Sequence, residues 1–347
     1  MKRNVGLDIV RSVAISLVLL AHSGFPHYLG IKFGGLGVEI FFVLSGFLIG
    51  KILIHDFSAS ITTKALFKFW SRRWFRTLPM YYLVLAFSFI FINHSLGWKV
   101  LAYVFFLQNN FVGISLMPVS WSLVIEEWFY ITVPIMFFIL FRKGIQPKKL
   151  IVFLSIFILA VLIFRTIWVL YTNRTWEAIV GNVPFRLDSL AIGVLLAAIK
   201  LYKKNFYVIF QKPFVFILIL LLFLGLELLM GQANTNQTTN QLIWTRTFFF
   251  SFQSVLIAGM IGFFESNQSV NRLKSGLLFC FTWISILSYS MYLIHPLVYD
   301  FFNTSNYFST LGISKMIFAN LFVILLSYIS YSFYEKPTTG LRDKIKW

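Results

Sequence analysis

Residues 11–22 read RSVAISLVLLAH, so an arginine and a histidine bracket ten residues that carry no charge. With the apolar residues around it, this run is long enough to cross a bilayer as a helix, which takes about 20 residues. At about 100° per residue, His22 returns to nearly the same face of that helix as Arg11, about 16 Å further along the axis. Because an ionisable side chain inside a membrane span is costly and usually functional, this pair is our first candidate for a site.

The composition of the chain indicates a membrane protein. Of the 347 residues, 59% are hydrophobic and only 12% are charged, and the mean hydropathy is +0.80. A soluble globular domain carries about twice that fraction of charged residues. The net charge of +18 does not indicate nucleic-acid binding, because the basic residues are spread over many loops and do not gather on one soluble face. One cysteine, Cys280, excludes an intramolecular disulfide framework and metal sites built from several cysteines.

Ten apolar segments are long enough to span a bilayer. They lie near 5–23, 35–55, 78–95, 119–141, 150–171, 184–201, 213–231, 243–264, 277–301 and 315–335. If the N-terminus is cytoplasmic, 22 of the 30 Lys and Arg fall in the inner segments, five fall in the outer ones, and Arg11, Arg165 and Arg186 fall within spans. Cytoplasmic loops are rich in Lys and Arg, so this alternation supports the assignment. The sequence therefore predicts one all-α domain over 1–347, a polytopic transmembrane bundle of about ten helices in the plasma or inner membrane, with both termini cytoplasmic.

Two shorter segments have other interpretations. Val100 to Leu107 is apolar but too short to cross, so we expect it to lie at the interface or to re-enter the membrane. The segment GGLGVE at 34–39 is rich in glycine but lacks the Lys-Ser/Thr of a phosphate-binding loop. Because it opens a predicted span, we interpret it as a place of close helix packing.

The predicted topology brings ionisable residues of three further spans to the level of His22. They are Glu126 and Glu127 in WSLVIEEWFY, Arg186 and Asp188 in PFRLDSLAIG, and His295 in SYSMYLIHP. A histidine with a nearby carboxylate is the usual pair for general base catalysis, since the carboxylate fixes the tautomer and stabilises the imidazolium. This level of the bundle is therefore a candidate catalytic site.

Structural interpretations of the same residues stay open. Arg11 would then turn toward the cytoplasm and pair with Asp8, and Arg186 would form a helix-packing ion pair with Asp188. A metal site of two histidines and a glutamate is disfavoured, because no H-x-x-x-H or comparable ligand spacing occurs. We therefore expect no metal.

The segment TTKALFKFWSRRWFRTLP at 62–79 carries a basic residue at every fourth position. Lys64, Lys68, Arg72 and Arg76 share one face of a helix, with Arg73 beside them. One interpretation is an interfacial helix on anionic lipid. The other is a clamp for phosphate groups, for which the planar guanidinium of arginine is better suited than lysine.

Seven motifs follow one another along almost the whole chain. They are LDIVRSVAISLVLLAH at 7–22, GVEIFFVLSGFLI at 37–49, RRWFRTLPMYY at 72–82, WSLVIEEWFY at 121–130, RLDSLAIGVLLA at 186–197, SYSMYLIHP at 288–296 and YEKP at 334–337. In this order they resemble the motifs of the acyltransferase-3 family of integral membrane acyltransferases. Longer members of that family carry an appended SGNH-type domain, and we expect none here.

The resemblance implies an enzyme that transfers groups other than amino-acyl groups, most often as an O-acetyltransferase. Such enzymes take an acyl group from cytoplasmic acyl-CoA, usually acetyl-CoA, and pass it to a hydroxyl near the outer face. The implied acceptor is a cell-surface polysaccharide or a lipid-linked glycan. Membrane lipid and proteins of polysaccharide assembly are the other implied partners.

The resemblance also implies roles for individual residues. The family's Arg-x10-His pair falls on Arg11 and His22. Arg11 would line the path of the pantetheine arm, and His22 would act as the base on the acceptor hydroxyl. Its glutamate falls on Glu126, which would position or charge-balance His22. A covalent acyl-His22 intermediate is the alternative mechanism.

The remaining candidate residues would bind substrates. The implied contacts of the CoA phosphates are Arg72, Arg73 and Arg76, of which Arg73 and Arg76 carry the family's Arg-x-x-Arg. The candidates for binding the rest of the substrate are Arg186, Asp188 and His295.

Two functions from other classes compete with acyl transfer. A transporter or exporter of polysaccharide intermediates would use the buried charges as a proton or substrate path. It gives no reason, however, for an arginine cluster at the cytoplasmic side. A membrane scaffold in a polysaccharide-assembly complex would use the charges only for structure.

Overall fold

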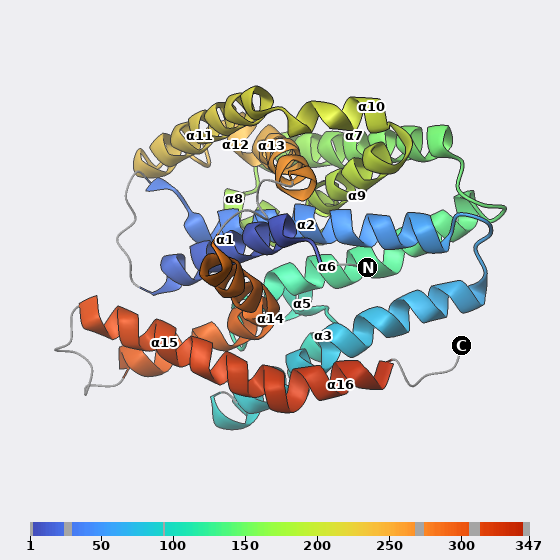
Figure 1. Cartoon of the computed structure of the whole chain (residues 1–347). Coiled ribbons are helices and arrows are strands. Elements are labelled where there is room, and N and C mark those ends of the chain that lie inside the picture. The colour runs from blue at the N-terminus through green and yellow to red at the C-terminus, as the bar shows by residue number, and fades with distance from the viewer. Residues whose placement is uncertain (1–2, 24–29, 93, 268–273, 305–312, 343–347) are drawn as a thin grey trace.

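The computed structural model describes residues 3–23, 30–92, 94–267, 274–304 and 313–342, which form a bundle of helices (Figure 1). The long helices are α1 (Val5–His22), α2 (Phe33–Asp56), α3 (Thr63–Phe91), α6 (Ser120–Leu140), α7 (Pro147–Thr172), α9 (Leu187–Tyr202), α11 (Pro213–Thr235), α13 (Phe248–Ser266), α14 (Ser275–Thr304) and α15 (Ile313–Ser330). The short ones are α4 (Val100–Val104), α5 (Gln108–Phe111), α8 (Trp176–Val180), α10 (Lys204–Tyr207), α12 (Ile243–Arg246) and α16 (Lys336–Leu341). No strand occurs in these ranges, so the all-α prediction is confirmed.

Nine of the ten predicted spans reappear as helices of membrane-spanning length. Within the described ranges, nine helices are long and apolar enough to cross a membrane. The span predicted near 184–201 is α9, which has 16 residues and a length of about 24 Å. It falls short of a hydrocarbon core of about 30 Å, because a 3₁₀ turn at Val183–Phe185 precedes it. The chain is a multi-pass membrane protein, and the compartment that each end faces stays a prediction.

The basic segment at 62–79 is continuous with the third span. Helix α3 begins at Thr63, where the Thr62 hydroxyl accepts a hydrogen bond from the Ala65 amide, and it continues through Pro79 to Phe91. A proline inside a helix removes one backbone hydrogen bond. Here the hydroxyl of Thr339 donates to the carbonyl of Phe75, at 3.5 Å. The third span therefore starts 15 residues earlier than predicted, and its first half carries the arginines into the bundle.

The apolar stretch after α3 forms α4 and packs on α3. The hydroxyls of Tyr81 and Tyr82 donate to the carbonyls of Tyr103 and Val104, at 2.9 and 3.0 Å. The side chain of Tyr103 is fully buried. The segment is too short to cross a bilayer, as expected.

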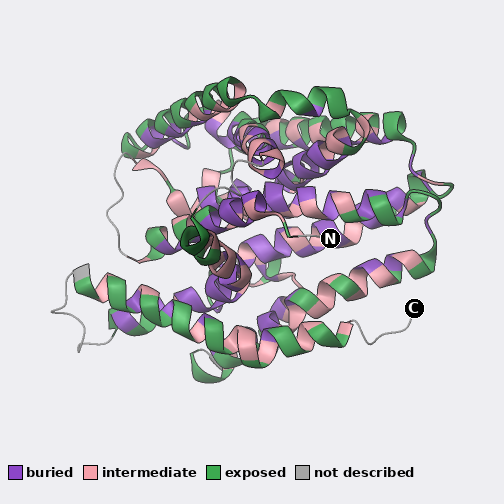
Figure 2. Cartoon of the chain, viewed as in Figure 1, coloured by how far each residue is buried: buried purple, intermediate pink, exposed green. Residues whose placement is uncertain are grey.

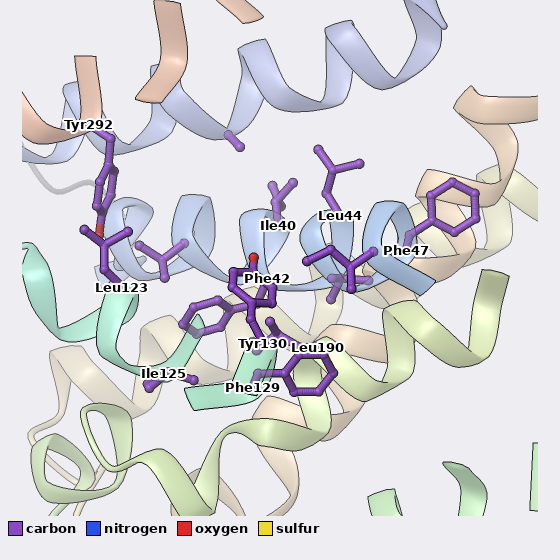
Figure 3. Close-up of a cluster of buried hydrophobic side chains, with 14 of the residues drawn as sticks. Ile40, Phe42, Leu44, Phe47, Leu123, Ile125, Phe129, Tyr130, Leu190 and Tyr292 are labelled. Carbon is purple, nitrogen blue, oxygen red and sulfur yellow. The ribbon is translucent and has the colours of Figure 1, made fainter. Parts of the chain in front are cut away.

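Helix α2 lies at the centre of the bundle. Figure 2 shows it largely buried, whereas α11 and α15 expose much of their length on the outside. In Figure 3, Phe42 of α2 lies close to Phe129 of α6 and Leu190 of α9, whereas Phe47 lies further along α2, and all four are buried. The outer helices expose leucine and phenylalanine instead, as expected of a surface that contacts lipid.

Glycines allow α2 to approach its neighbours closely. A Cβ on Gly37 would lie 2.5 Å from the carbonyl oxygen of Ala14 on α1, so the predicted close packing of the segment at 34–39 is confirmed. A Cβ on Gly46 would lie 1.9 Å from the carbonyl oxygen of Leu190 on α9. At both glycines the nearest atom is a backbone carbonyl oxygen of the neighbouring helix, which cannot move aside as a flexible side chain could.

We expect Gly46→Ala to destabilise the bundle, because α2 and α9 would have to separate. Overpacking of this kind costs about 1–3 kcal/mol. Thermal unfolding of the purified protein in detergent measures the effect. Gly225→Ala on α11 is the matched control, since a Cβ there meets nothing within 4 Å. Equal unfolding temperatures for the two variants would contradict the close approach at Gly46.

The two ends of α2 mark the two ends of the bundle. At its C-terminal end, Oδ2 of Asp56 lies 3.7 Å from Nη1 of Arg72, and we call this the Arg72 end. At its N-terminal end, Gly34 packs against the imidazole of His22, and we call this the His22 end. The 24 residues of α2 separate these ends by about 36 Å.

Candidate active site

A cavity of about 130 Å³ lies between α1, α2, α3, α6 and α14, and we call it the central cavity. Its walls are mostly apolar, with residues such as Phe41 and Leu48 of α2. Its charged lining residues are Arg11, Arg73, Arg76 and Glu126. Four residues that lie up to 115 positions apart in the sequence therefore meet around one space.

A wider cavity of about 360 Å³ adjoins the central cavity at the Arg72 end, and we call it the basic mouth. The two cavities share Arg73 and Arg76 in their walls. Arg72, Arg342 and Asp56 line the basic mouth but not the central cavity. The predicted arginine cluster is thus brought together at the entrance to the central cavity.

Glu126 is held by a hydrogen-bond network at the wall of the central cavity. Its carboxylate accepts from the hydroxyls of Ser45, at 3.1 Å, and Tyr130, at 2.9 Å. Nη2 of Arg73 lies 3.6 Å from the same carboxylate and donates to the Tyr130 hydroxyl at 2.5 Å. The structure therefore pairs Glu126 with Arg73, whereas the sequence placed it beside His22.

The neighbouring Glu127 has a different environment. It is buried, and its carboxylate accepts from the hydroxyl of Thr77 at 3.2 Å. It is absent from the residues that line the central cavity. Of the two adjacent glutamates, Glu126 is the one that faces the cavity.

Arg11 faces the central cavity and is not paired directly with Asp8. Its Nη1 donates to the hydroxyl of Ser285 at 3.3 Å, and that hydroxyl donates to Asp8 at 2.7 Å. The carboxylate of Asp8 instead pairs with Nε of Arg3, at 2.5 Å. The structural interpretation of Arg11 as the ion-pair partner of Asp8 therefore does not describe this arrangement.

His22 and His295 lie side by side at the His22 end, with ring centroids 5.0 Å apart. Nδ1 of His22 is 2.8 Å from the carbonyl of Val18, and Nδ1 of His295 is 3.0 Å from that of Met291. A carbonyl only accepts hydrogen bonds, so each Nδ1 carries the proton and a neutral ring keeps its lone pair on Nε2. This is the nitrogen that is able to take a proton from a substrate.

Tyr292 lies in the wall of the central cavity and contacts His295, whereas neither histidine lines the cavity. Its ring lies 5.8 Å from that of His295, and it also lines the cavity. Its hydroxyl lies 2.6 Å from that of Ser122 and donates to the carbonyl of Val119 at 2.9 Å. Figure 3 shows its side chain reaching from α14 toward Leu123 of α6.

Arg186 and Asp188 lie in a separate buried network and do not pair with each other. Arg186 pairs with Glu39 of α2, and Nη2 of Arg165 on α7 lies 3.1 Å from Oδ2 of Asp188. These side chains are at most 2% exposed. The ion pairs join Asp188 of α9, and Arg186 just before it, to two other helices, while the role of both residues in substrate binding stays a prediction.

Sequence reasoning missed the hydroxyl residues of the site. Tyr130 lies four residues after Glu126 on α6, and Tyr292 lies three residues before His295 on α14. Helical spacing of three or four places such pairs on one face. Within the described ranges, no group of three or more His, Cys, Asp and Glu residues is arranged to hold a metal ion.

The fold and this site define a class, multi-pass membrane proteins with a charged cavity between their helices. The chain belongs to the acyltransferase-3 family, whose acyltransferase domain matches residues 4–332. It is similar to O-acetyltransferase OatA of Staphylococcus aureus strains NCTC 8325 / PS 47, COL and MRSA252, each 27% identical over 353 residues. The match covers 96% of this chain and 56% of each relative, so the chain spans about half the length of the curated relatives it matches. No solved structure matches it.

Proposed function

We propose that the protein is a membrane O-acetyltransferase that moves an acetyl group from acetyl-CoA to a hydroxyl of a glycan. The donor enters from the cytoplasm at the Arg72 end, and the acceptor binds at the His22 end, outside the cell membrane. The observation that carries the proposal is the central cavity, which leads from an arginine-lined mouth into the bundle. The family and the relatives named O-acetyltransferase support the same reaction.

The basic mouth suits the phosphate groups of the donor. Guanidinium groups bind phosphate with two parallel hydrogen bonds, and Arg72, Arg73 and Arg76 line this space together. The central cavity beyond it has apolar walls, as binding sites for extended organic groups usually do. The thioester would then lie toward Tyr292 and the two histidines.

His22 supplies the base in this proposal. Its Nε2 takes the proton of the acceptor hydroxyl while the oxygen attacks the thioester carbonyl. The new C–O bond forms, the C–S bond breaks, and the CoA thiolate leaves and takes up the proton from His22. A covalent acyl-His22 intermediate is the competing mechanism.

Acetyl transfer itself is the test of the proposed function. Purified protein in liposomes is incubated with radiolabelled acetyl-CoA and candidate glycans, and the glycans are analysed by mass spectrometry. Label on the glycan supports the enzyme. Movement of intact glycan without label supports a transporter. If the glycan is neither labelled nor moved, a scaffold is supported. Either of these two outcomes would overturn the proposal.

We expect Arg76→Ala to raise KM for acetyl-CoA by about 10–100-fold, since a hydrogen bond to a charged group contributes about 1.5–3 kcal/mol. Arg76 is the variant of choice because Arg73 also holds Glu126. Lys68→Ala is the matched control, as Lys68 lies on the same basic face but lines neither cavity. If KM for acetyl-CoA is the same in both variants, the arginines do not bind the donor, and the interpretation that they bind lipid is favoured.

A further inference from the structure

A groove of about 580 Å³ lies between α5, the start of α6, the C-terminal part of α7 and α8. We call it the tryptophan groove, and it is defined by Asn109, Trp121, Trp168, Arg174, Trp176 and Asn182. It belongs to the His22 end, because Nζ of Lys32, the residue before α2, lies 3.8 Å from the centre of the Trp176 ring. None of the reactions described above uses this groove.

Two residues of the groove hold polar atoms without a partner in the described part of the chain. Asn109 donates through Nδ2 to the carbonyls of Trp121 and Gly181, at 3.0 and 2.8 Å, and this leaves its Oδ1 unpaired. Nε1 of Trp176 is likewise buried and unpaired. Buried polar atoms nearly always have partners, so one acceptor and one donor are left over at this groove.

The residue types at the groove fit a saccharide better than other ligands. A pyranose ring has an apolar face of C–H groups, which stacks on indole rings, and a rim of hydroxyls, which pair with amides. Three tryptophans supply the first surface, and Asn109, Asn182 and the neighbouring Asn110 supply the second. An acyl chain would leave the asparagines unpaired, and nucleic acid would meet Glu177 beside the one arginine.

The groove is also close to the central cavity. A narrow inner cavity of about 30 Å³ shares Trp121 and Trp176 with the groove and has Arg186 in its wall. The ring of Trp121 packs edge-on against Phe42, with centroids 6.1 Å apart, and Phe42 lines the central cavity. One pair of aromatic rings therefore separates the groove from the proposed donor site.

We propose that the tryptophan groove binds the acceptor as a saccharide chain, with a pyranose ring stacked on Trp168 and a hydroxyl that accepts a hydrogen bond from Nε1 of Trp176. This inference rests on the proposed O-acetyltransferase function, for which it names the acceptor's binding site. Asn109 and Asn182 hydrogen-bond the hydroxyls of the same chain. The stacked ring holds the acceptor at the His22 end while one hydroxyl reaches the thioester.

The test measures binding of soluble oligosaccharides to the purified protein, with intrinsic tryptophan fluorescence as the signal. The probes are maltohexaose, cellohexaose and chitohexaose. We expect at least one of them to change the fluorescence, and Trp168→Ala and Trp176→Ala each to weaken its binding at least about 10-fold, as for buried tryptophans at other interfaces. Trp98→Ala is the matched control, because Trp98 is 79% exposed and lies outside the groove.

Donor binding separates the two proposals. Acetyl-CoA affinity should be the same in the wild type and in the two groove variants, which also shows that these variants are folded. Trp168→Phe should restore most of the oligosaccharide affinity, because it keeps an aromatic face. If no probe binds, or if the groove variants bind it like the wild type while acetyl-CoA still binds, the groove assignment is wrong and the proposed function stands. If the wild-type protein does not bind acetyl-CoA, the proposed function itself is wrong.

Discussion

His22→Ala is expected to lower kcat for acetyl transfer by about 10²–10⁴-fold, the usual contribution of a positioned general base. KM for acetyl-CoA should change little, because the arginines that we assign to the donor lie at the other end of α2. Steady-state kinetics with acetyl-CoA and a glycan acceptor measure both constants. A wild-type kcat in this variant would exclude both the general-base and the acyl-histidine mechanisms.

A single-turnover experiment separates those two mechanisms. Wild-type protein is mixed with radiolabelled acetyl-CoA without acceptor and quenched at short times. Label that stays on the protein, and is absent in His22→Ala, indicates an acyl-His22 intermediate. Unlabelled protein with full activity toward the acceptor indicates that His22 acts as the base.

Arg165→Met is expected to destabilise the bundle by about 3–5 kcal/mol, the cost of removing one partner of a buried ion pair. Arg165 is fully buried and binds Asp188, the carbonyl of Thr247 and the hydroxyl of Ser251. The substitution would leave the carboxylate of Asp188 without its counter-charge. Thermal or denaturant unfolding in detergent, followed by far-UV circular dichroism, measures the change.

Two further variants give this prediction its controls. Lys149→Met removes a positive charge from an exposed position of the same helix and should leave stability almost unchanged. The double variant Arg165→Met with Asp188→Leu removes both charges and should recover much of the loss, since apolar replacements of buried pairs are often neutral. If the double variant were as unstable as the single one, packing and not charge would explain the effect.

The sequence predicted the helices well because their signal is local. A run of about 20 apolar residues specifies a span without reference to the rest of the chain. The exceptions also have local causes, at the turn before α9 and at the basic start of α3. The start of α3 was predicted too late, because the sequence does not distinguish arginines inside a bundle from arginines at a membrane surface.

The site was predictable only as far as spacing along one helix reaches. The meeting of Arg73 and Arg76 at one cavity follows from their spacing on a single helix, whereas Arg11 lines that cavity and His22 does not. Depth in the membrane was a poorer guide, because Glu126 meets Arg73 rather than a histidine. The pairing of Arg186 with Glu39 joins residues 147 positions apart, and only packing of α2 against α9 determines it.

The position of Tyr292 also bears on how tightly this protein insulates the membrane. An enzyme whose substrates arrive from two compartments risks becoming a pore whenever both of its entrances are open. Here the ring of Tyr292 lies between the central cavity and His295, and its hydroxyl donates to the carbonyl of Val119 at the start of α6. Tyr292 therefore forms the wall of the central cavity on the side of His295. If the proposed acetyl transfer takes place across the bilayer, this wall would help to keep the two compartments separate.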